Sequence, residues 1–288
     1  MNEKINDKYA KLYIGDSFSK TKTKKKAKVV AFDLDETLGS FIDLEILWRL
    51  INDIHIQSNI SFNNLLDLYP EFLRYGIISI LEYLCQKKQS GECSKIYIYT
   101  NNQCSVEWTQ LISKYFDYKL NLNAPLFDQI INAFKINDKR IELLRTSHDK
   151  IHNDFITCTL LPNITEICFV DNSYFDAMRN DYIYYIQPRS YYHHLSPKEI
   201  INRFINSNVG KSLSSANKVL FYKNLYDYFQ RDVYYKQTAN VSKKIETDIY
   251  VAQKIMYHIK EFFFLAKRKK RTRKIKLYFG KLTRKKRL

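Results

Sequence analysis

Short apolar runs alternate with stretches of helical periodicity in the middle of the chain. The runs favour buried strands, because they are nearly continuous and rich in β-branched or aromatic residues. They lie at 29–32, 95–99, 167–170 and 181–186. Apolar residues recur at helical spacing at 42–54, 72–84, 104–117, 139–144 and 151–158. Strands separated by helices predict an α/β fold, with a parallel Rossmann-like sheet that has helices on both faces.

The segments around this alternating pattern differ from it in composition. Residues 1–27 are polar and rich in lysine, so we expect a loose basic arm. We place one domain at 28–195, and within it the helical pattern of 39–73 predicts a small insert that caps the site. Helical periodicity without a clear strand continues over 196–266, which predicts a helical extension that ends in a basic tail at 267–288.

The net charge of +17 is concentrated in two segments. Residues 20–28 contain six lysines and no acid, and residues 267–288 contain thirteen Lys or Arg and no acid. The rest of the chain is therefore close to neutral. Charges this dense bind polyanions, so the tail is predicted to contact nucleic acid or an acidic partner. A nuclear-import signal and a merely solubilising run are the alternatives.

Cysteine usage and hydropathy bear on the compartment. The five cysteines are an odd number without a C-x-x-C pair, which argues against a disulfide framework and a zinc ribbon. No run approaches the roughly 20 apolar residues that cross a bilayer, and the first residues lack the apolar core of a signal peptide. We therefore expect an intracellular protein of the nucleus or cytoplasm.

Two aspartates follow the first predicted strand. Asp33 and Asp35 are two positions apart, and on an extended segment such residues point the same way. Both carboxylates would then face one pocket, where they repel each other unless a cation lies between them. Hard oxygen ligands of this kind suit Mg²⁺. The motif therefore predicts a magnesium site.

The second and third predicted strands also end in polar residues. Thr100 and Asn101 follow the second strand, and Asp171 and Asn172 follow the third. Ligands bind at the carboxyl ends of strands in open α/β sheets, so these groups should meet the first pair. A phosphate dianion would still need a cation, and Lys150 is the best placed because it opens an apparent helix leading to the third strand.

Other residues compete for roles in this site. Lys135 and Lys139 are alternatives to Lys150 as the phosphate-binding lysine. Asp176 is either a further acidic ligand or an acidic residue at a helix start. The histidines at 148 and 152 are four apart, but without another ligand at suitable spacing we interpret them as surface or rim residues.

The order of these motifs resembles that of the haloacid-dehalogenase-like (HAD) phosphohydrolases, over residues 28–195. That order is D-x-D-x-T after one strand, Thr or Ser after the next, a Lys, and an acidic motif after another strand. The motif sequences D-L-D-E-T-L and V-D-N-S look most like those of the branch that contains RNA polymerase II C-terminal-domain phosphatases and nuclear-LIM-interactor-interacting-factor proteins. Residues 74–76, Arg-Tyr-Gly, are similar to the Arg-Pro-Gly of that branch. The bias toward Ile, Lys, Asn and Tyr is similar to that of chains from large DNA viruses, which makes a viral source one interpretation.

The resemblance implies a role for each residue of the phosphate site. Asp33 would be the nucleophile that forms an aspartyl-phosphate. Asp35 would protonate the leaving oxygen and then activate water. Thr100, Asn101 and Lys150 would hold the phosphoryl oxygens and offset their charge.

The resemblance also implies a metal centre. Asp33, the backbone carbonyl of Asp35, and Asp171 would bind Mg²⁺, which lets an anionic carboxylate approach an anionic phosphate. Asn172 would orient a ligand or a metal-bound water, and Thr37 would support the site.

Two departures from the branch leave the substrate open. Tyr174 stands where the polymerase-tail phosphatases have Pro, and the helical segment 39–73 differs from a short flap. The first hypothesis is a phosphoprotein phosphatase that acts on phosphoserine. The alternatives are a nucleotide or nucleic-acid-end phosphatase, and an inactive HAD-fold protein that binds nucleic acid or serves as a scaffold. The oligomeric state is left open.

Overall fold

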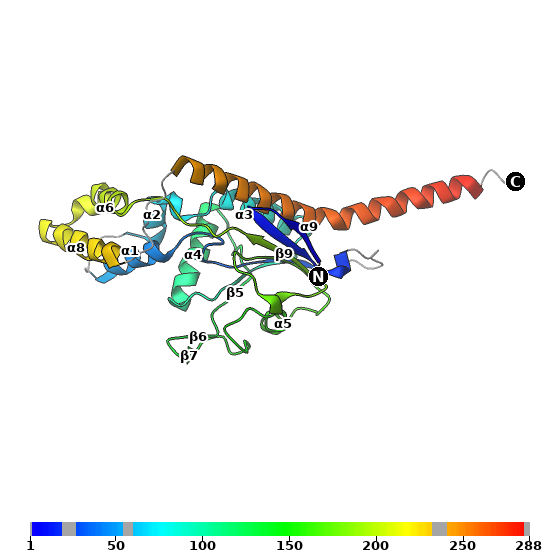
Figure 1. The fold of residues 1–288 in the computed structure, drawn as a ribbon, viewed down its shortest axis with the longest axis horizontal. Coiled ribbons are helices and arrows are strands. Elements are labelled where there is room, and N and C mark those ends of the chain that lie inside the picture. The colour runs from blue at the N-terminus through cyan, green and yellow to red at the C-terminus, as the bar shows by residue number, and fades with distance from the viewer. Residues whose placement is uncertain (1, 19–26, 54–59, 232–240, 285–288) are drawn as a thin grey trace.

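A computed structural model of the chain describes residues 2–18, 27–53, 60–231 and 241–284 (Figure 1). Within these residues a seven-stranded sheet has the order β1-β2-β9-β8-β3-β4-β5. The strands of this sheet are β1 Asn2–Asn6, β2 Ala10–Ile14, β3 Lys28–Phe32, β4 Lys95–Tyr99, β5 Gln129–Ile131, β8 Glu166–Val170 and β9 Ile183–Pro188. A separate hairpin joins β6 Lys135–Ile136 and β7 Lys139–Arg140. The helices are α1 Ile42–Asp53, α2 Phe62–Asp67, α3 Ile77–Gln89, α4 Val106–Lys119, α5 His152–Thr159, α6 Pro197–Asn206, α7 Asn208–Ser212, α8 Ser215–Arg231 and α9 Val241–Arg284.

The centre of the sheet is parallel, as the sequence predicts. β3 pairs in parallel with β4 on one side and with β8 on the other, and β9 continues the parallel order beyond β8. The four apolar runs identified in the sequence form these four strands. The carboxyl ends of β3, β4 and β8 therefore lie at one edge of the sheet.

Alternate residues of the central strands face two separate cores. On β3, Val30 and Phe32 belong to a large core that includes residues of α3, α4 and α9. Val29 and Ala31 face a smaller core with Phe155 of α5. This alternation follows from the two-residue period of a strand, and burial on both faces explains why these strands are continuous apolar runs. In Figure 1, α3 and α9 lie on one side of the sheet and α5 on the other.

The first residues of the chain belong to the sheet, which corrects the prediction of a loose arm for residues 2–14. β1 pairs with β2, and β2 pairs antiparallel with β9. The prediction failed because β2 has only five residues, too few to show a strand pattern among its polar neighbours; in the structure its Ala10 and Leu12 are buried. Residues 19–26, which hold most of the predicted lysine cluster, lie outside the described residues.

The helix predicted at 139–144 is also wrong. β6 and β7 form a tight hairpin whose two turn residues, Asn137 and Asp138, have φ angles of 47° and 61°. Two left-handed residues are the hallmark of a type I′ hairpin, in which Asn and Asp are favoured. The turn preference of Asn137 and Asp138 therefore decides the local structure, and the apparent helical spacing after them does not.

The helical region after 196 packs against the domain. α6 starts with a capping box in which Ser196 and Glu199 satisfy each other's backbone groups. α8 contacts α1 and α6, and α9 contacts β9 and β2. Lys28 donates a 2.6 Å hydrogen bond to the carbonyl of Phe262 in α9. α9 runs without a break across the predicted boundary at 266, so the extension and most of the tail share one helix.

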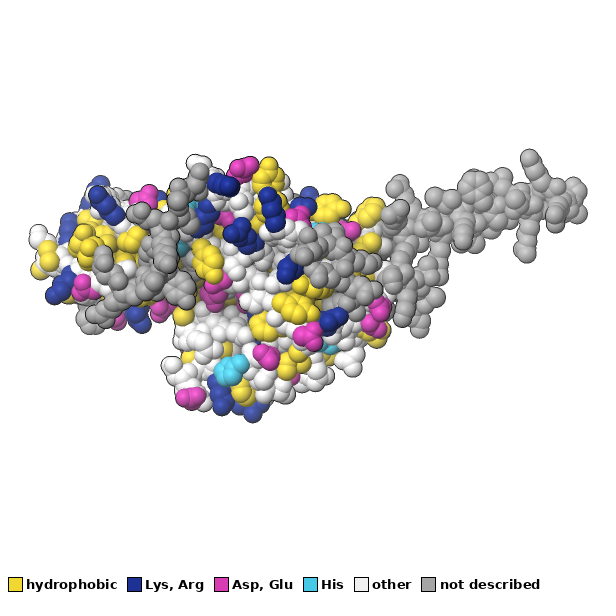
Figure 2. Space-filling model, viewed as in Figure 1, with side chains coloured by type: hydrophobic (Ala, Val, Ile, Leu, Met, Phe, Trp, Pro, Cys, Tyr) yellow, Lys and Arg dark blue, Asp and Glu magenta, His cyan; other side chains and the backbone are white. Residues whose placement is uncertain are grey.

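The described charged side chains of both signs are mixed on one face of the body. On the face shown in Figure 2, the described basic and acidic side chains lie among one another. No helix within the described ranges is long and apolar enough to cross a membrane.

Candidate active site

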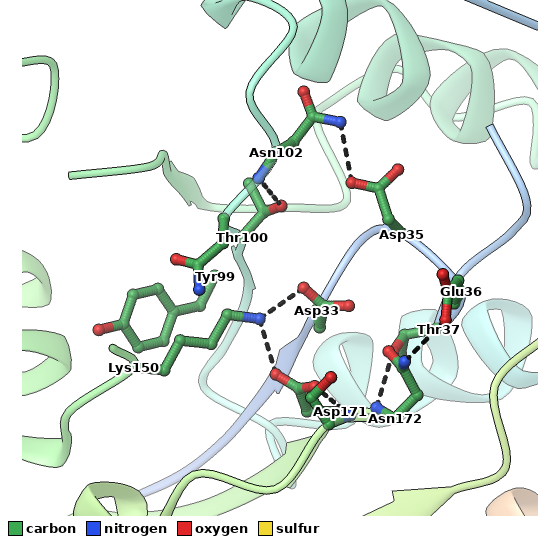
Figure 3. A network of polar contacts seen from close by, with 12 residues as sticks. Asp33, Asp35, Glu36, Thr37, Tyr99, Thr100, Asn102, Lys150, Asp171 and Asn172 are labelled. Carbon is green, nitrogen blue, oxygen red and sulfur yellow. Dashed lines mark hydrogen bonds and ion pairs between the residues drawn. The ribbon is translucent and has the colours of Figure 1, made fainter. Parts of the chain in front are cut away.

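An open pocket of about 240 Å³ lies at the carboxyl ends of β3, β4 and β8. The strand pairing continues past the strand ends, because the amide of Asp33 donates to the carbonyl of Val170 at 2.9 Å. This places Asp33 beside Asp171, the residue that follows Val170 (Figure 3). The pocket is lined by Asp33, Asp35, Glu36, Asn101, Asn102, Lys150, Asp171, Asn172, Ser173 and Phe175.

Lys150 joins two of the carboxylates. Its Nζ lies 2.5 Å from Oδ1 of Asp33 and 2.6 Å from Oδ2 of Asp171, and all three residues are buried. Burial alone would lower the pKa of Lys150, but the charges of Asp171 and Asp33 outweigh burial and raise it. Lys150 therefore stays protonated, and among the three candidate lysines it is the one that lines the pocket.

The two other lysines lie elsewhere. Lys135 and Lys139 are on the β6–β7 hairpin, where Lys139 is exposed. Asp176 is exposed and pairs with Arg179 at 3.2 Å, so it is no part of the pocket. His148 packs edge-on against Phe134, at 5.5 Å between ring centroids.

Asp35 differs from Asp33 in its surroundings. Its Oδ2 accepts a 2.8 Å hydrogen bond from the side-chain amide of Asn102. Burial and the negative charge of Asp33 raise the pKa of Asp35 to about 7. Burial likewise raises the pKa of Asp171. Two carboxyl groups two residues apart thus have different partners, one an ammonium and the other a neutral amide.

Thr37 and Asn172 tie the loop after β3 to the loop after β8. The Thr37 hydroxyl donates to Oδ1 of Asn172 at 2.8 Å and accepts from the Asn172 backbone amide at 3.0 Å. The Asn172 side-chain amide also donates to Glu36 and Ser190. The side chain of Asn172 thus joins loops in this structure, whereas the resemblance implied that it orients a ligand or a water.

The end of β4 contributes two amides to the pocket. Asn101 and Asn102 line it, whereas Thr100 is buried next to them and its hydroxyl accepts from the Asn102 backbone amide at 3.0 Å. Asn102 was not singled out from the sequence, although it belongs to the same run of polar residues after the strand. The signal for it was present in the pattern T-N-N-Q.

Two buried arginines, to which the sequence analysis assigned no role, support the pocket. Arg74 donates to the backbone carbonyls of Thr37 at 2.5 Å and Arg189 at 2.9 Å, and also to that of Glu36. It thereby braces the turn after Asp35, in which Glu36 has a left-handed φ of 58°. Arg145 plays a similar part under the loop that carries Lys150.

No described residue of the predicted insert lines the pocket. α1 buries Leu44, Leu47 and Ile51 in the large core, and α2 buries Leu65 and Leu66 there. The apolar periodicity of 39–73 reflects this packing. The lining residues come from the strand ends and from the loop that precedes α5.

The donor set of the pocket can be compared with the needs of a metal ion. The described residues contain no group of three His, Cys, Asp or Glu side chains arranged to hold a metal. Asp35 turns its carboxyl group to Asn102, which leaves Asp33 and Asp171 as the two carboxylates that share one cation, Lys150. Mg²⁺ is commonly bound by one or two carboxylates and retains several waters. The chemistry of these two donors therefore fits Mg²⁺.

No family model, curated protein or solved structure matches the chain. The pocket itself combines four acids, Asp33, Asp35, Glu36 and Asp171, with the ammonium of Lys150. Such a site can supply a nucleophile, a proton donor and a cation within one small volume.

Proposed function

We propose that the chain is a Mg²⁺-dependent phosphomonoester hydrolase of the HAD type, with an aspartyl-phosphate intermediate. The observation that carries this proposal is the arrangement of Asp33, Lys150 and Asp171 around one pocket, with Asp35 beside them. A nucleophile next to a fixed cation and a separate acid is what phosphoryl transfer to a carboxylate requires.

The first chemical step transfers the phosphoryl group to the protein. Lys150 holds Oδ1 of Asp33, so Oδ2 attacks phosphorus and the bond from phosphorus to the leaving oxygen breaks. Asp35 gives its proton to that oxygen, and a pKa of about 7 suits a general acid at neutral pH. Lys150 offsets the charge of the phosphoryl oxygens.

The second step releases phosphate. Asp35, now ionised, takes a proton from a water that attacks the phosphorus of the aspartyl-phosphate. The bond between phosphorus and Oδ2 breaks, which restores the Asp33 carboxylate and yields inorganic phosphate. Mg²⁺, held by Asp33 and Asp171, would supply additional positive charge for the approach of carboxylate and phosphate.

The proposed substrate is a phosphoprotein that carries phosphoserine. The pocket is open at the edge of the sheet, and no described part of the insert closes it. A phosphoester on a large partner can therefore reach it. The basic residues at 267–288 would attract an acidic target. A nucleotide or a nucleic-acid end is the second substrate class, favoured by the same basic residues.

Hydrolysis of p-nitrophenyl phosphate with Mg²⁺ tests the enzyme proposal. We expect turnover by the parent chain and its loss in Asp33→Asn, which keeps the shape of the side chain and removes the nucleophile. A phosphoserine peptide, nucleoside monophosphates and a 3′-phosphorylated oligonucleotide then rank the substrate classes. Absence of turnover in the parent, together with tight binding of a polyanion, would favour the inactive nucleic-acid-binding or scaffold protein.

A further inference from the structure

Arg145 lies in the segment of the chain that joins β7 to α5, and its side chain is 0% exposed. Its Nη1 donates to the backbone carbonyls of Thr100 at 2.9 Å and Asn132 at 2.8 Å. Its Nη2 donates to the side-chain oxygen of Asn101 at 2.6 Å. One guanidinium therefore fixes both the end of β4 and the orientation of an amide that lines the pocket.

The same guanidinium also holds the chain just before Lys150. Nη2 lies 3.2 Å from the carbonyl of His148 and 3.2 Å from that of Asp149. On the other side of Lys150, the amide of Ile151 donates to the Tyr99 hydroxyl at 3.2 Å. The neighbours of Lys150 on both sides are thus tied to a fixed group.

Arg145 and Tyr99 form one support. The guanidinium carbon lies 4.8 Å from the centroid of the Tyr99 ring, in cation–π contact. Tyr99 is itself buried on β4, so its ring and hydroxyl are set by the sheet. Lys150 is thereby positioned relative to β4, the strand after which Asn101 follows.

The acceptors of these bonds are carbonyl and amide oxygens. A buried cation costs several kcal/mol unless its donors are satisfied, and only the planar fork of arginine reaches acceptors on three separate segments. A lysine at 145 would offer one nitrogen to the same oxygens. Arg145 therefore acts here through the planar geometry of its guanidinium more than through its charge.

We propose that Arg145 is a positioning residue, which sets Lys150 and Asn101 for phosphate binding through the Arg145–Tyr99 support. This inference rests on the proposed phosphatase function. Displacement of a catalytic group by about 1 Å costs on the order of 10²-fold in rate. Loss of Arg145 should therefore lower kcat without direct contact between Arg145 and substrate.

A double-mutant cycle between Arg145→Met and Lys150→Met tests the inference, with p-nitrophenyl phosphate and Mg²⁺. We expect Arg145→Met to lower kcat about 10²-fold, Lys150→Met to lower it further, and the double variant to lose clearly less than the product of the two single losses. Coupling of this kind means that Arg145 acts through Lys150. If the fold-loss of kcat in the double variant equals the product of the two single fold-losses, the residues act independently and the inference is overturned.

Two further variants separate positioning from a general loss of stability. Arg203→Met removes a bidentate ion pair with Glu71, and neither residue lines the pocket, so it should lower the melting temperature and leave kcat unchanged. Arg145→Lys keeps the charge but not the fork, and it should stay impaired; full activity in this variant would contradict the inference. Should Arg145→Met fail to fold, Tyr99→Phe, which loses only the hydroxyl, replaces it in the cycle.

Failure of the proposed function gives a different pattern. If the parent hydrolyses no phosphoester, the function is wrong, and the same cycle is measured on the affinity for inorganic phosphate by calorimetry. Coupled losses of affinity would still support the role of Arg145, whereas independent losses would refute it. If the parent is active and the losses in kcat multiply, only the positioning role fails.

Discussion

Replacement of Lys150 by Met would leave the carboxylates of Asp33 and Asp171 facing each other without their shared ammonium. The Nζ–O distances of 2.5 and 2.6 Å give a gross attraction of about 6 kcal/mol for each pair at an effective dielectric constant near 20. Much of this offsets the desolvation of the three groups. Removal of one partner from a buried ion pair typically costs about 3–5 kcal/mol, since a charge is left uncompensated.

The loss should be visible in calorimetry and should depend on Mg²⁺. At about 2–4 °C per kcal/mol for a domain of this size, the melting temperature should fall by on the order of 10 °C. Mg²⁺ at about 100 times its dissociation constant stabilises a protein by about 2.7 kcal/mol. The gain should be larger in Lys150→Met than in the parent, because the dication can occupy the place of the ammonium.

Lys119→Met is the matched control for this experiment. Lys119 pairs with Asp67 at 2.6 Å, but its side chain is 40% exposed, so its removal should cost at most about 1 kcal/mol. No Mg²⁺-dependent difference from the parent is expected there. Equal destabilisation by the two substitutions, or an equal Mg²⁺ gain in Lys150→Met and the parent, would refute the electrostatic account of the pocket.

Three further predictions concern parts of the chain outside this triad. Burial pushes the pKa of Glu71 upward, but the ion pair with Arg203 outweighs burial and holds that pKa below its ordinary value of 4.5. The ion pair should therefore add up to about 1 kcal/mol above the ordinary pKa, and this contribution is lost as the pH falls through the lower folded-state pKa. Urea unfolding of Glu71→Gln should differ from the parent near neutral pH and converge with it in acid. Thr37→Val removes both hydrogen bonds to Asn172 and should cost about 1–3 kcal/mol in the same assay, and a change within error would contradict the loop tie. Deletion of residues 267–288 should weaken heparin binding and flatten its salt dependence, with p-nitrophenyl phosphate turnover unchanged; a collapse of turnover would make the tail part of the fold.

The central strands could be predicted because local composition decides them. Residues 29–32 and 167–170 are buried on both faces, and only continuous apolar runs suit such positions. The polar residues that follow them, Asp33 and Asp171, were then placed by a general rule for parallel sheets. β5 escaped detection because Gln129–Ile131 is too short to show a period, and its pairing with β4 is a tertiary event.

The support of the site could not be predicted from local sequence. Arginine is almost always exposed, so nothing in the sequence around Arg145 indicates that it is buried. Its acceptors lie at 100–101, at 132 and at 148–149, three segments that only the folded sheet brings together. The polar run T-N-N-Q pointed to the end of β4, but the pairing of Asn102 with Asp35 likewise depends on the end of β4 lying beside the end of β3.

The antiparallel pairing of β2 with β9 constrains the order in which the molecule assembles. Residues 10–14 find their hydrogen-bond partners at 184–188, so a long loop must close before this edge of the sheet exists. Synthesis supplies the earlier segment first, yet it has nowhere to dock until the later one is in place. β2 can therefore join the sheet only after β9 has been made, and until then β9 exposes an unpaired edge that another chain could join.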